Sequence, residues 1–156
     1  MRRKDREVTD KDKIRGIISN CHCCRLGLND HGRVYIVPLS FGFQEKEGSY
    51  TFYFHGAKAG RKMDLIKENG YAGFEMDTNY ALNEADRACE YSARFQSVIG
   101  SGRVSVIEDT EEKQKALRAI MYHNTGKDEW KFSDKMVNAA CVFQLKPEEL
   151  SCKEHL

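Results

Sequence analysis

Apolar residues recur at helical spacing near the start of the chain. They fall at i, i+3, i+4 and i+7, which places them on one face of a helix. These positions are Ile14, Ile17, Ile18 and Cys21. Thr9 can cap this helix, with Asp12 three residues later as in a capping box. We therefore expect a helix from about residue 10 and a loose arm over residues 1–8.

The next segments are rich in aromatic and β-branched residues, which is typical of strands. Residues 23–43 predict a β-hairpin around the turn NDHG, and EKEGS (residues 45–49) predicts a second turn. YTFYF (residues 50–54) is a third strand. Pro38 interrupts the hairpin's second strand, and a proline cannot donate to a β ladder. That strand therefore belongs at an edge or contains a bulge.

The spacing of apolar residues changes again after Gly60, from that of a strand to that of a helix. Residues 61–69 predict a short helix ended by Gly70, and YAGFEMD is a strand. Residues 79–90 look irregular, whereas residues 91–109 form one long strand or a pair, with Gly100 and Gly102 indicating a bulge or a close backbone approach. The remaining expected elements are a long helix over 110–126, a short helix over 133–138 and a last strand over 139–147.

These elements together favour one fold class. About six strands follow each other in hairpin-like order, without the regular alternation that parallel sheets require. We expect an α+β fold with a six-stranded antiparallel sheet closed as a small barrel and flanked by helices. The length of 156 residues suits a single domain over residues 1–156.

The composition argues against nucleic-acid binding, a membrane span and secretion. Lys and Arg number 25 against 24 Asp and Glu, a net charge of +1, which argues against general nucleic-acid binding. No run of about 18 apolar residues exists, so we expect no membrane span. The charged start of the chain lacks the apolar stretch of a secretory signal, so we expect a cytoplasmic protein.

Six cysteines include the cluster CHCC at residues 21–24. A disulfide framework is not expected without a secretion signal. A structural zinc site usually has two ligand pairs, and here the second pair is missing. We favour cysteines that act as small buried hydrophobes, with metal binding as the alternative.

The segment FHGAKAGRKMDLI (residues 54–66), which we call the basic corner, combines glycines with three basic residues where a strand meets a helix. A phosphate at a helix N-terminus meets free N–H groups and the positive end of the dipole. The spacing excludes the nucleotide-triphosphate loop, since three rather than four residues separate Gly56 and Gly60 and Met63 replaces the hydroxyl residue. A solvent-exposed turn with incidental charge is the alternative.

Several segments together resemble the FMN-binding split-barrel superfamily, the pyridoxamine 5'-phosphate oxidase-like proteins, and most of all the nitroimidazole-resistance (Nim-type) flavoproteins. The segments are MRRKDREVTD at the start, CRLGL, VPLSFGF, YFHGAKAGRKMDLI, QSVIGSGRV and ALRAIMYHNTG. The resemblance implies a six-stranded split barrel that forms a homodimer, with FMN in a groove at the interface.

The resemblance also implies site residues. Arg61 and Lys62 match the pair that holds the FMN phosphate, with Lys58 a weaker candidate. The expected contacts of the flavin ring are Pro38, Leu39 and Ser40 on one strand, and Gln96, Ser97 and Val98 on the long strand.

His55 matches a family histidine that approaches the flavin and the substrate, so it is our candidate for substrate contact or proton delivery. The alternative is a hydrogen bond to the loop. Trp130 either covers a flavin or fills the core, and we favour the core. The chain end PEELSCKEHL lacks a counterpart of the oxidases' substrate-binding Trp and Arg region, which puts pyridoxamine phosphate in doubt as a substrate.

The sequence thus predicts an FMN-dependent oxidoreductase that reduces small aromatic acceptors such as nitroimidazoles. The alternative is a flavin- or haem-binding split-barrel module without dedicated turnover.

Overall fold

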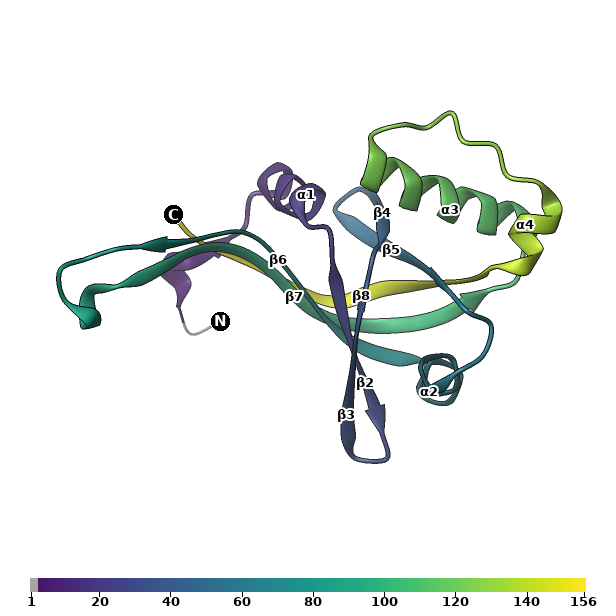
Figure 1. Cartoon of the computed structure of the whole chain (residues 1–156), viewed down its shortest axis with the longest axis horizontal. Helices are drawn as coiled ribbons and strands as arrows, with labels where there is room; N and C mark the ends of the chain where they lie inside the picture. The colour runs from purple at the N-terminus through teal and green to yellow at the C-terminus, as the bar shows by residue number, and fades with distance from the viewer. Residues whose placement is uncertain (1–2) are drawn as a thin grey trace.

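A computed structural model describes residues 3–156. One twisted antiparallel sheet runs through the molecule, and four α-helices flank it (Figure 1). The elements in chain order are the 3-10 helix η1 (Lys4–Arg6), β1 (Glu7–Val8), α1 (Lys11–Asn20), β2 (Cys24–Asp30), β3 (Arg33–Leu39), β4 (Gly42–Lys46), β5 (Ser49–Gly56), α2 (Arg61–Asn69), β6 (Tyr71–Asn83), the 3-10 helix η2 (Ala88–Glu90), β7 (Ser92–Ile107), α3 (Thr110–Thr125), α4 (Asp134–Ala139) and β8 (Cys141–His155).

The sheet contains eight strands rather than the expected six. Its order is β3-β2-β6-β7-β8-β5-β4, and β1 adds to β8. The extra strands arise at two places. The expected strand over residues 33–43 breaks at Ser40–Phe41 into β3 and β4, and Glu7–Val8 pairs with β8 where we expected a loose arm.

The break at Ser40–Phe41 shapes the whole sheet. β3 and β4 are its two end strands, yet only two residues connect Leu39 to Gly42. Two linking residues span at most about 11 Å, so the sheet must curl until its ends come close. Within residues 3–156 the two end strands do not pair with each other, so the barrel stays open.

β7 carries the bulge that its glycines predict. The β7–β8 register shifts between Ser101 and Gly102, and a Cβ on Gly102 would lie 2.1 Å from the Lys146 carbonyl oxygen. Only glycine fits such a close backbone approach.

The segment expected to be irregular, residues 79–90, is largely strand. β6 continues to Asn83 and pairs with β7, with a register shift between Thr78 and Ala81. Asn79 adopts a positive φ of 56° at this shift. The bulge interrupts the alternation of apolar and polar residues, which is why the strand was not visible in the sequence.

Both faces of β5 and β8 are buried, in two clusters. Phe52, Phe54 and Phe143 belong to the larger core, to which α1 and α2 contribute. Tyr53 and Val142 alternate with them and pack under α3. Each such buried side chain stabilises the fold by roughly 1.5–3 kcal/mol relative to exposure.

Local details correct two expectations and confirm a third. Asp10, not Thr9, caps α1, and its carboxylate accepts a hydrogen bond from Lys13 N at 2.7 Å. Trp130, expected in the core, lies in the connection between α3 and α4 and is 37% exposed.

Cys21 and Cys24 are fully buried, as we expected. Burial raises the pKa of Cys21 to about 12 and also raises that of Cys24, so both thiols stay protonated.

None of the helices within residues 3–156 combines the length and the apolar character that a membrane crossing requires.

Candidate functional site

The basic corner joins β5 to α2, as its sequence predicted. Gly60 is the N-cap of α2, with φ 118°, and no side chain caps this helix. The first N–H groups of a helix have no intrahelical partner, and Gly60 has no side chain to cover them. The nine-residue helix therefore presents an uncovered positive end at this corner.

Arg61 turns from the corner toward the β2–β3 hairpin. Its guanidinium donates to the carboxylate of Asp30, with Nε 3.0 Å from Oδ2. The same guanidinium lies over the ring of Tyr35, 4.5 Å from the centroid. An ion pair and a cation–π contact thus hold Arg61 at the rim between α2 and the edge strand β3.

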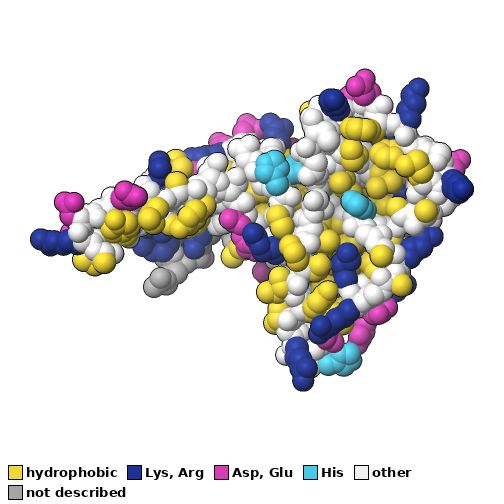
Figure 2. Space-filling view, in the orientation of Figure 1, with side chains coloured by type: hydrophobic (Ala, Val, Ile, Leu, Met, Phe, Trp, Pro, Cys, Tyr) yellow, Lys and Arg dark blue, Asp and Glu magenta, His cyan; other side chains and the backbone are white. Residues whose placement is uncertain are grey.

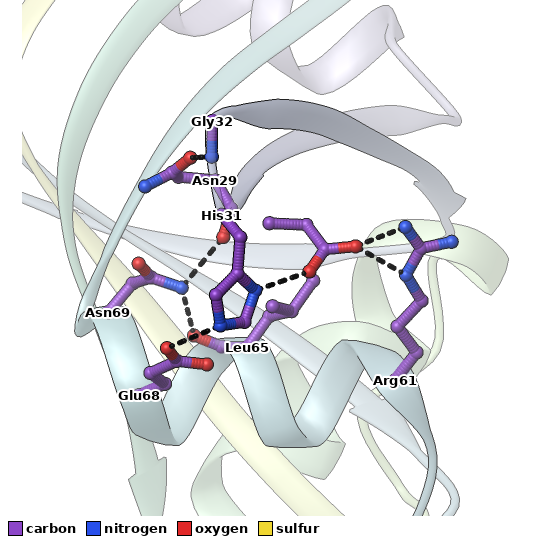
Figure 3. A network of polar contacts seen from close by, with 8 residues as sticks. Asn29, His31, Gly32, Arg61, Leu65, Glu68 and Asn69 are labelled. Atoms are coloured by element: carbon purple, nitrogen blue, oxygen red, sulfur yellow. Dashed lines mark hydrogen bonds and ion pairs between the residues drawn. The ribbon is translucent and has the colours of Figure 1, made fainter.

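The turn of this hairpin is fastened to α2 by a polar network (Figure 3). His31 Nδ1 lies 3.0 Å from Asp30 Oδ1, and His31 Nε2 lies 3.5 Å from Glu68 Oε1. Asn69 Nδ2 donates to the carbonyl oxygens of Asn29 and Leu65, both at 2.9 Å.

Charge in the network shifts two pKa values in opposite directions. Asp30 first and then Glu68 raise the pKa of His31, whereas the hydrogen bonds from His31 and Arg61 lower the pKa of Asp30. Both shifts favour the charged forms that hold the turn to α2.

Whereas Arg61 lies over Tyr35 of the hairpin, Lys62 lies beside Phe143 of the larger core. Its Nζ lies 5.6 Å from the centroid of the Phe143 ring, in space that Gly56 leaves free. A Cβ on Gly56 would lie 2.7 Å from this Nζ. Burial lowers the pKa of Lys62, a shift that Cys141 opposes in part, and within residues 3–156 no carboxylate forms an ion pair with this ammonium group.

The chemistry of this corner fits a phosphate group. A half-buried ammonium group without a counter-charge is unfavourable, and an anion would relieve it with charge-assisted hydrogen bonds. The uncapped end of α2 adds N–H donors next to it.

Two of the expected site residues, Pro38 and Leu39, lie at the end of the edge strand β3, and Ser40 follows in the break before β4. Pro38 and Ser40 are exposed, while Leu39 is half-buried against the core. β3 is an end strand of the sheet, so one row of its backbone groups has no strand partner, and Pro38 lies where a strand tolerates proline.

Gln96, Ser97 and Val98 lie elsewhere on the molecule. Val98 is fully buried and Gln96 nearly so. Gln96 accepts a hydrogen bond from Asn79 Nδ2 at 2.6 Å and donates one to Glu154 at 3.1 Å. Gln96 and Arg103 are seven positions apart on β7, a length of about 23 Å, and Arg103 pairs with Tyr71 just after the C-terminal end of α2.

His55 is also separated from the lysine of the corner. His55 is exposed at the end of β5. It lies on the same face of the strand as Tyr53, which packs under α3. Lys62 lies over the opposite face, beside Gly56. The structure thus brings Arg61 and Lys62 to one corner but does not bring His55 or Gln96 to it within one chain.

Sequence reasoning missed Asp30 and Tyr35, the two partners of Arg61. Asp30 was visible only as a turn residue and Tyr35 only as one member of a strand. Their role depends on how the hairpin packs against α2, which no local pattern encodes.

Comparisons with known proteins agree with this fold. The family model for pyridoxamine 5'-phosphate oxidase matches residues 10–154. The chain belongs to the pyridoxamine 5'-phosphate oxidase family. A comparison with curated protein sequences found no match.

Solved structures with this fold include a candidate 5-nitroimidazole antibiotic resistance protein from Bacteroides thetaiotaomicron. It is 32% identical, with a TM-score of 0.81, over 95% of this chain and 86% of that one. The flavocytochrome Anf3 from Azotobacter vinelandii is 23% identical over 100% of this chain and 72% of that one, with a TM-score of 0.80. An FAD and haem binding protein from Mycobacterium smegmatis is 18% identical over 96% of this chain and 73% of that one, with a TM-score of 0.81.

Proposed function

We propose that this protein is an FMN-binding oxidoreductase that reduces small aromatic acceptors such as nitroimidazoles. The observation that carries the proposal is the half-buried Lys62, which has no counter-charge and lies beside the uncapped end of α2 in a chain of this family. When bound, FMN would supply the redox chemistry, which no side chain of the corner can provide.

The residues of the corner bind and orient the cofactor in this proposal. Arg61 and Lys62 hold the phosphate, with Lys58 as a further cation near it. The edge of β3 at Pro38 and Leu39, with Ser40 directly after it, offers backbone groups to the ring. Arg61 lies over Tyr35 and Lys62 over Phe143, so both side chains would have to turn toward a phosphate to give it two charge-assisted contacts.

The wide separation within one chain supports a homodimer with FMN at the interface. Gln96 lies about 23 Å along β7 from Arg103, beside the C-terminal end of α2, so a second copy would bring Gln96, Ser97 and Val98 to the cofactor. The arm formed by β6 and β7 projects from the body (Figure 1) and carries the exposed side chains of Tyr80, Leu82 and Tyr91. Light scattering should give twice the chain mass of 17.9 kDa, and a mass of one chain would contradict the shared site.

His55 remains our candidate for substrate contact or proton delivery. Its exposed position at the end of β5 leaves the imidazole accessible to a small molecule, and imidazole exchanges protons near neutral pH. The 32% identity to the candidate nitroimidazole resistance protein supports nitroaromatic compounds as the substrate class.

An anaerobic oxidation assay tests this function. The protein-bound flavin is reduced with dithionite, a nitroimidazole is added, and the absorbance of oxidised flavin is followed. We expect rapid reoxidation, slowed by about 100-fold in His55→Ala, since proton transfer contributes on this scale. His22→Ala, which removes another exposed histidine, is the matched control. A reduced flavin that the nitroimidazole leaves unchanged would contradict reductase activity, and normal turnover in His55→Ala would remove His55 from it.

A flavin- or haem-binding module without dedicated turnover is the second candidate. The names of two proteins with the same fold, a flavocytochrome and an FAD and haem binding protein, support it. A Soret band in the purified protein would favour this candidate over the reductase.

A further inference from the structure

The C-terminal end of β8 carries a histidine, His155, beside the projecting β6–β7 arm (Figure 1). We propose that His155 is a further residue of the flavin site, where its Nε2 atom accepts a hydrogen bond from an N–H group of the flavin ring. This inference rests on the proposed function, because it needs a flavin that is shared between two copies of the chain.

The two faces of the arm differ in what covers them. Val98 is fully buried, and Gln96 bonds to Glu154. Glu154 in turn forms an ion pair with Lys13 of α1, so this helix lies against the face of Gln96. Because side chains alternate along a strand, Ser97 lies on the opposite, outer face. Of the three flavin contacts expected on β7, Ser97 is therefore the one whose side chain faces outward.

His155 shares this outer face with Ser97. Residues directly opposite each other on antiparallel strands lie on the same face of the sheet. Lys153 of β8 lies opposite Ser97, and the next outward pair along the arm is Phe95 with His155. Ile99, two residues from Ser97 in the other direction, is 49% exposed, so the outer face is open to a ligand beside these pairs.

A backbone contact fixes the orientation of the His155 ring. Its Nδ1 atom lies 2.7 Å from the carbonyl oxygen of Ala93. A carbonyl oxygen can only accept, so Nδ1 carries the hydrogen, and Nε2 of the neutral ring is left as an acceptor. Among the described residues Nε2 has no hydrogen-bond partner. The half-buried imidazole thus offers one oriented acceptor.

The ring of Phe95 determines which part of the cofactor suits this acceptor. Its centroid lies 6.4 Å from that of the His155 ring, and the two planes are inclined by 58°. An aromatic ring beside a fixed acceptor suits a flat ligand that carries an N–H group. The flavin ring has both properties, whereas the phosphate end of FMN has neither. The ring end of the cofactor is therefore the part that His155 would contact.

His155 and the basic corner of one chain lie far apart. Phe95, the partner of His155, is eight positions from Arg103 on β7, which is about 26 Å, and Arg103 lies beside the C-terminal end of α2. His155 of one copy would therefore meet the flavin whose phosphate the corner of the other copy holds.

Two substitutions of His155 separate a ligand contact from a structural one. The short amide of asparagine occupies about the place of Nδ1, so His155→Asn can keep the bond to Ala93 but loses the acceptor at Nε2. The longer amide of glutamine reaches about the place of Nε2, so His155→Gln can keep that acceptor and loses the bond to Ala93. A purely structural role would favour asparagine, and a flavin contact would favour glutamine.

The measurement is the dissociation constant of FMN from the purified holoprotein, obtained by dilution and fluorescence of the released flavin. We expect an increase of about tenfold in His155→Asn, from the loss of one hydrogen bond, and a value near that of the wild type in His155→Gln. The absorbance maximum of the bound flavin should shift in His155→Asn alone. His22→Asn, at another exposed histidine, is the control and should change neither quantity.

The outcomes separate this inference from the proposed function. Weaker FMN binding by His155→Asn than by His155→Gln supports the contact. Equal FMN affinity of the two variants, or weaker binding by His155→Gln, would overturn it, while a wild type that holds FMN would leave the proposed function in place. A wild type that binds no flavin would overturn both.

Discussion

The two basic residues at the start of α2 differ in what satisfies their charge. Arg61 has an ion pair with Asp30 and an aromatic contact with Tyr35, so the folded chain already fixes its position. Lys62 lies over the Phe143 ring but has no ion pair within the described residues, and burial lowers its pKa. We infer that Arg61 is held ready for the ligand, whereas Lys62 gains most when an anion binds.

The hairpin network allows a prediction at the same scale. Asp30→Asn should lower the pKa of His31 toward its ordinary value, because Asp30 is the largest cause of the raised pKa. NMR titration of the imidazole measures this. Asp64→Asn, an exposed carboxylate on α2, is the control and should leave the pKa of His31 unchanged.

The sign of the pH dependence follows from the direction of the shift. A histidine with a raised folded-state pKa adds stability that is complete below its unfolded pKa of about 6.5 and is lost as the pH rises through the folded value. The difference in unfolding free energy between wild type and Asp30→Asn should therefore shrink above pH 6.5. An unchanged His31 pKa in Asp30→Asn would show that the contact does not form in solution.

At the scale of elements, glycine placement controls how β4 meets α3. A Cβ on Gly42 would lie 2.3 Å from the backbone nitrogen of Ile120 and 2.4 Å from the carbonyl carbon of Ala119. Backbone atoms of a packed helix cannot yield as a flexible side chain would. The close contact of β4 with α3 therefore depends on this glycine.

Gly42→Ala should destabilise the protein by about 1–3 kcal/mol, the usual range for overpacking. Gly16→Ala is the matched control, since Gly16 lies within α1 and a Cβ there would meet nothing within 4 Å. That control should gain about 0.5–1 kcal/mol, because alanine favours the helix over glycine. Urea denaturation measures both, and a neutral Gly42→Ala would show that α3 does not pack on β4 as described.

Elements with local end signals could be predicted from the sequence. The left-handed glycines Gly70 and Gly126 end α2 and α3 as expected, and Asp109 caps α3. The β3–β4 break and the two-residue β1 could not be predicted, because both depend on how the sheet curls. The same holds at the site: the charges of Arg61 and Lys62 were visible, but their divergence depends on Asp30 and Gly56.

At the scale of the whole molecule, the expected cofactor contacts form two groups. One group surrounds the basic corner and the edge of β3, and the other lies far along β7 toward the projecting β6–β7 arm (Figure 1). Hydrophobic side chains are visible along that arm in Figure 2, and Tyr80, at 70%, is the most exposed of its large ones. A monomer would leave both the arm and the edge strand uncovered, which is consistent with the proposed homodimer.

The most direct test of the account is the chromophore of the purified protein. We predict a flavin absorbance spectrum and, after denaturation, release of a compound with the mass of FMN at one molecule per chain. Arg61→Ala/Lys62→Ala should lose this flavin, while Lys127→Ala/Lys131→Ala, an exposed pair of the same charge between α3 and α4, should keep it. A colourless wild type that added FMN cannot reconstitute, or a double corner variant that retains stoichiometric flavin, would contradict the central claim.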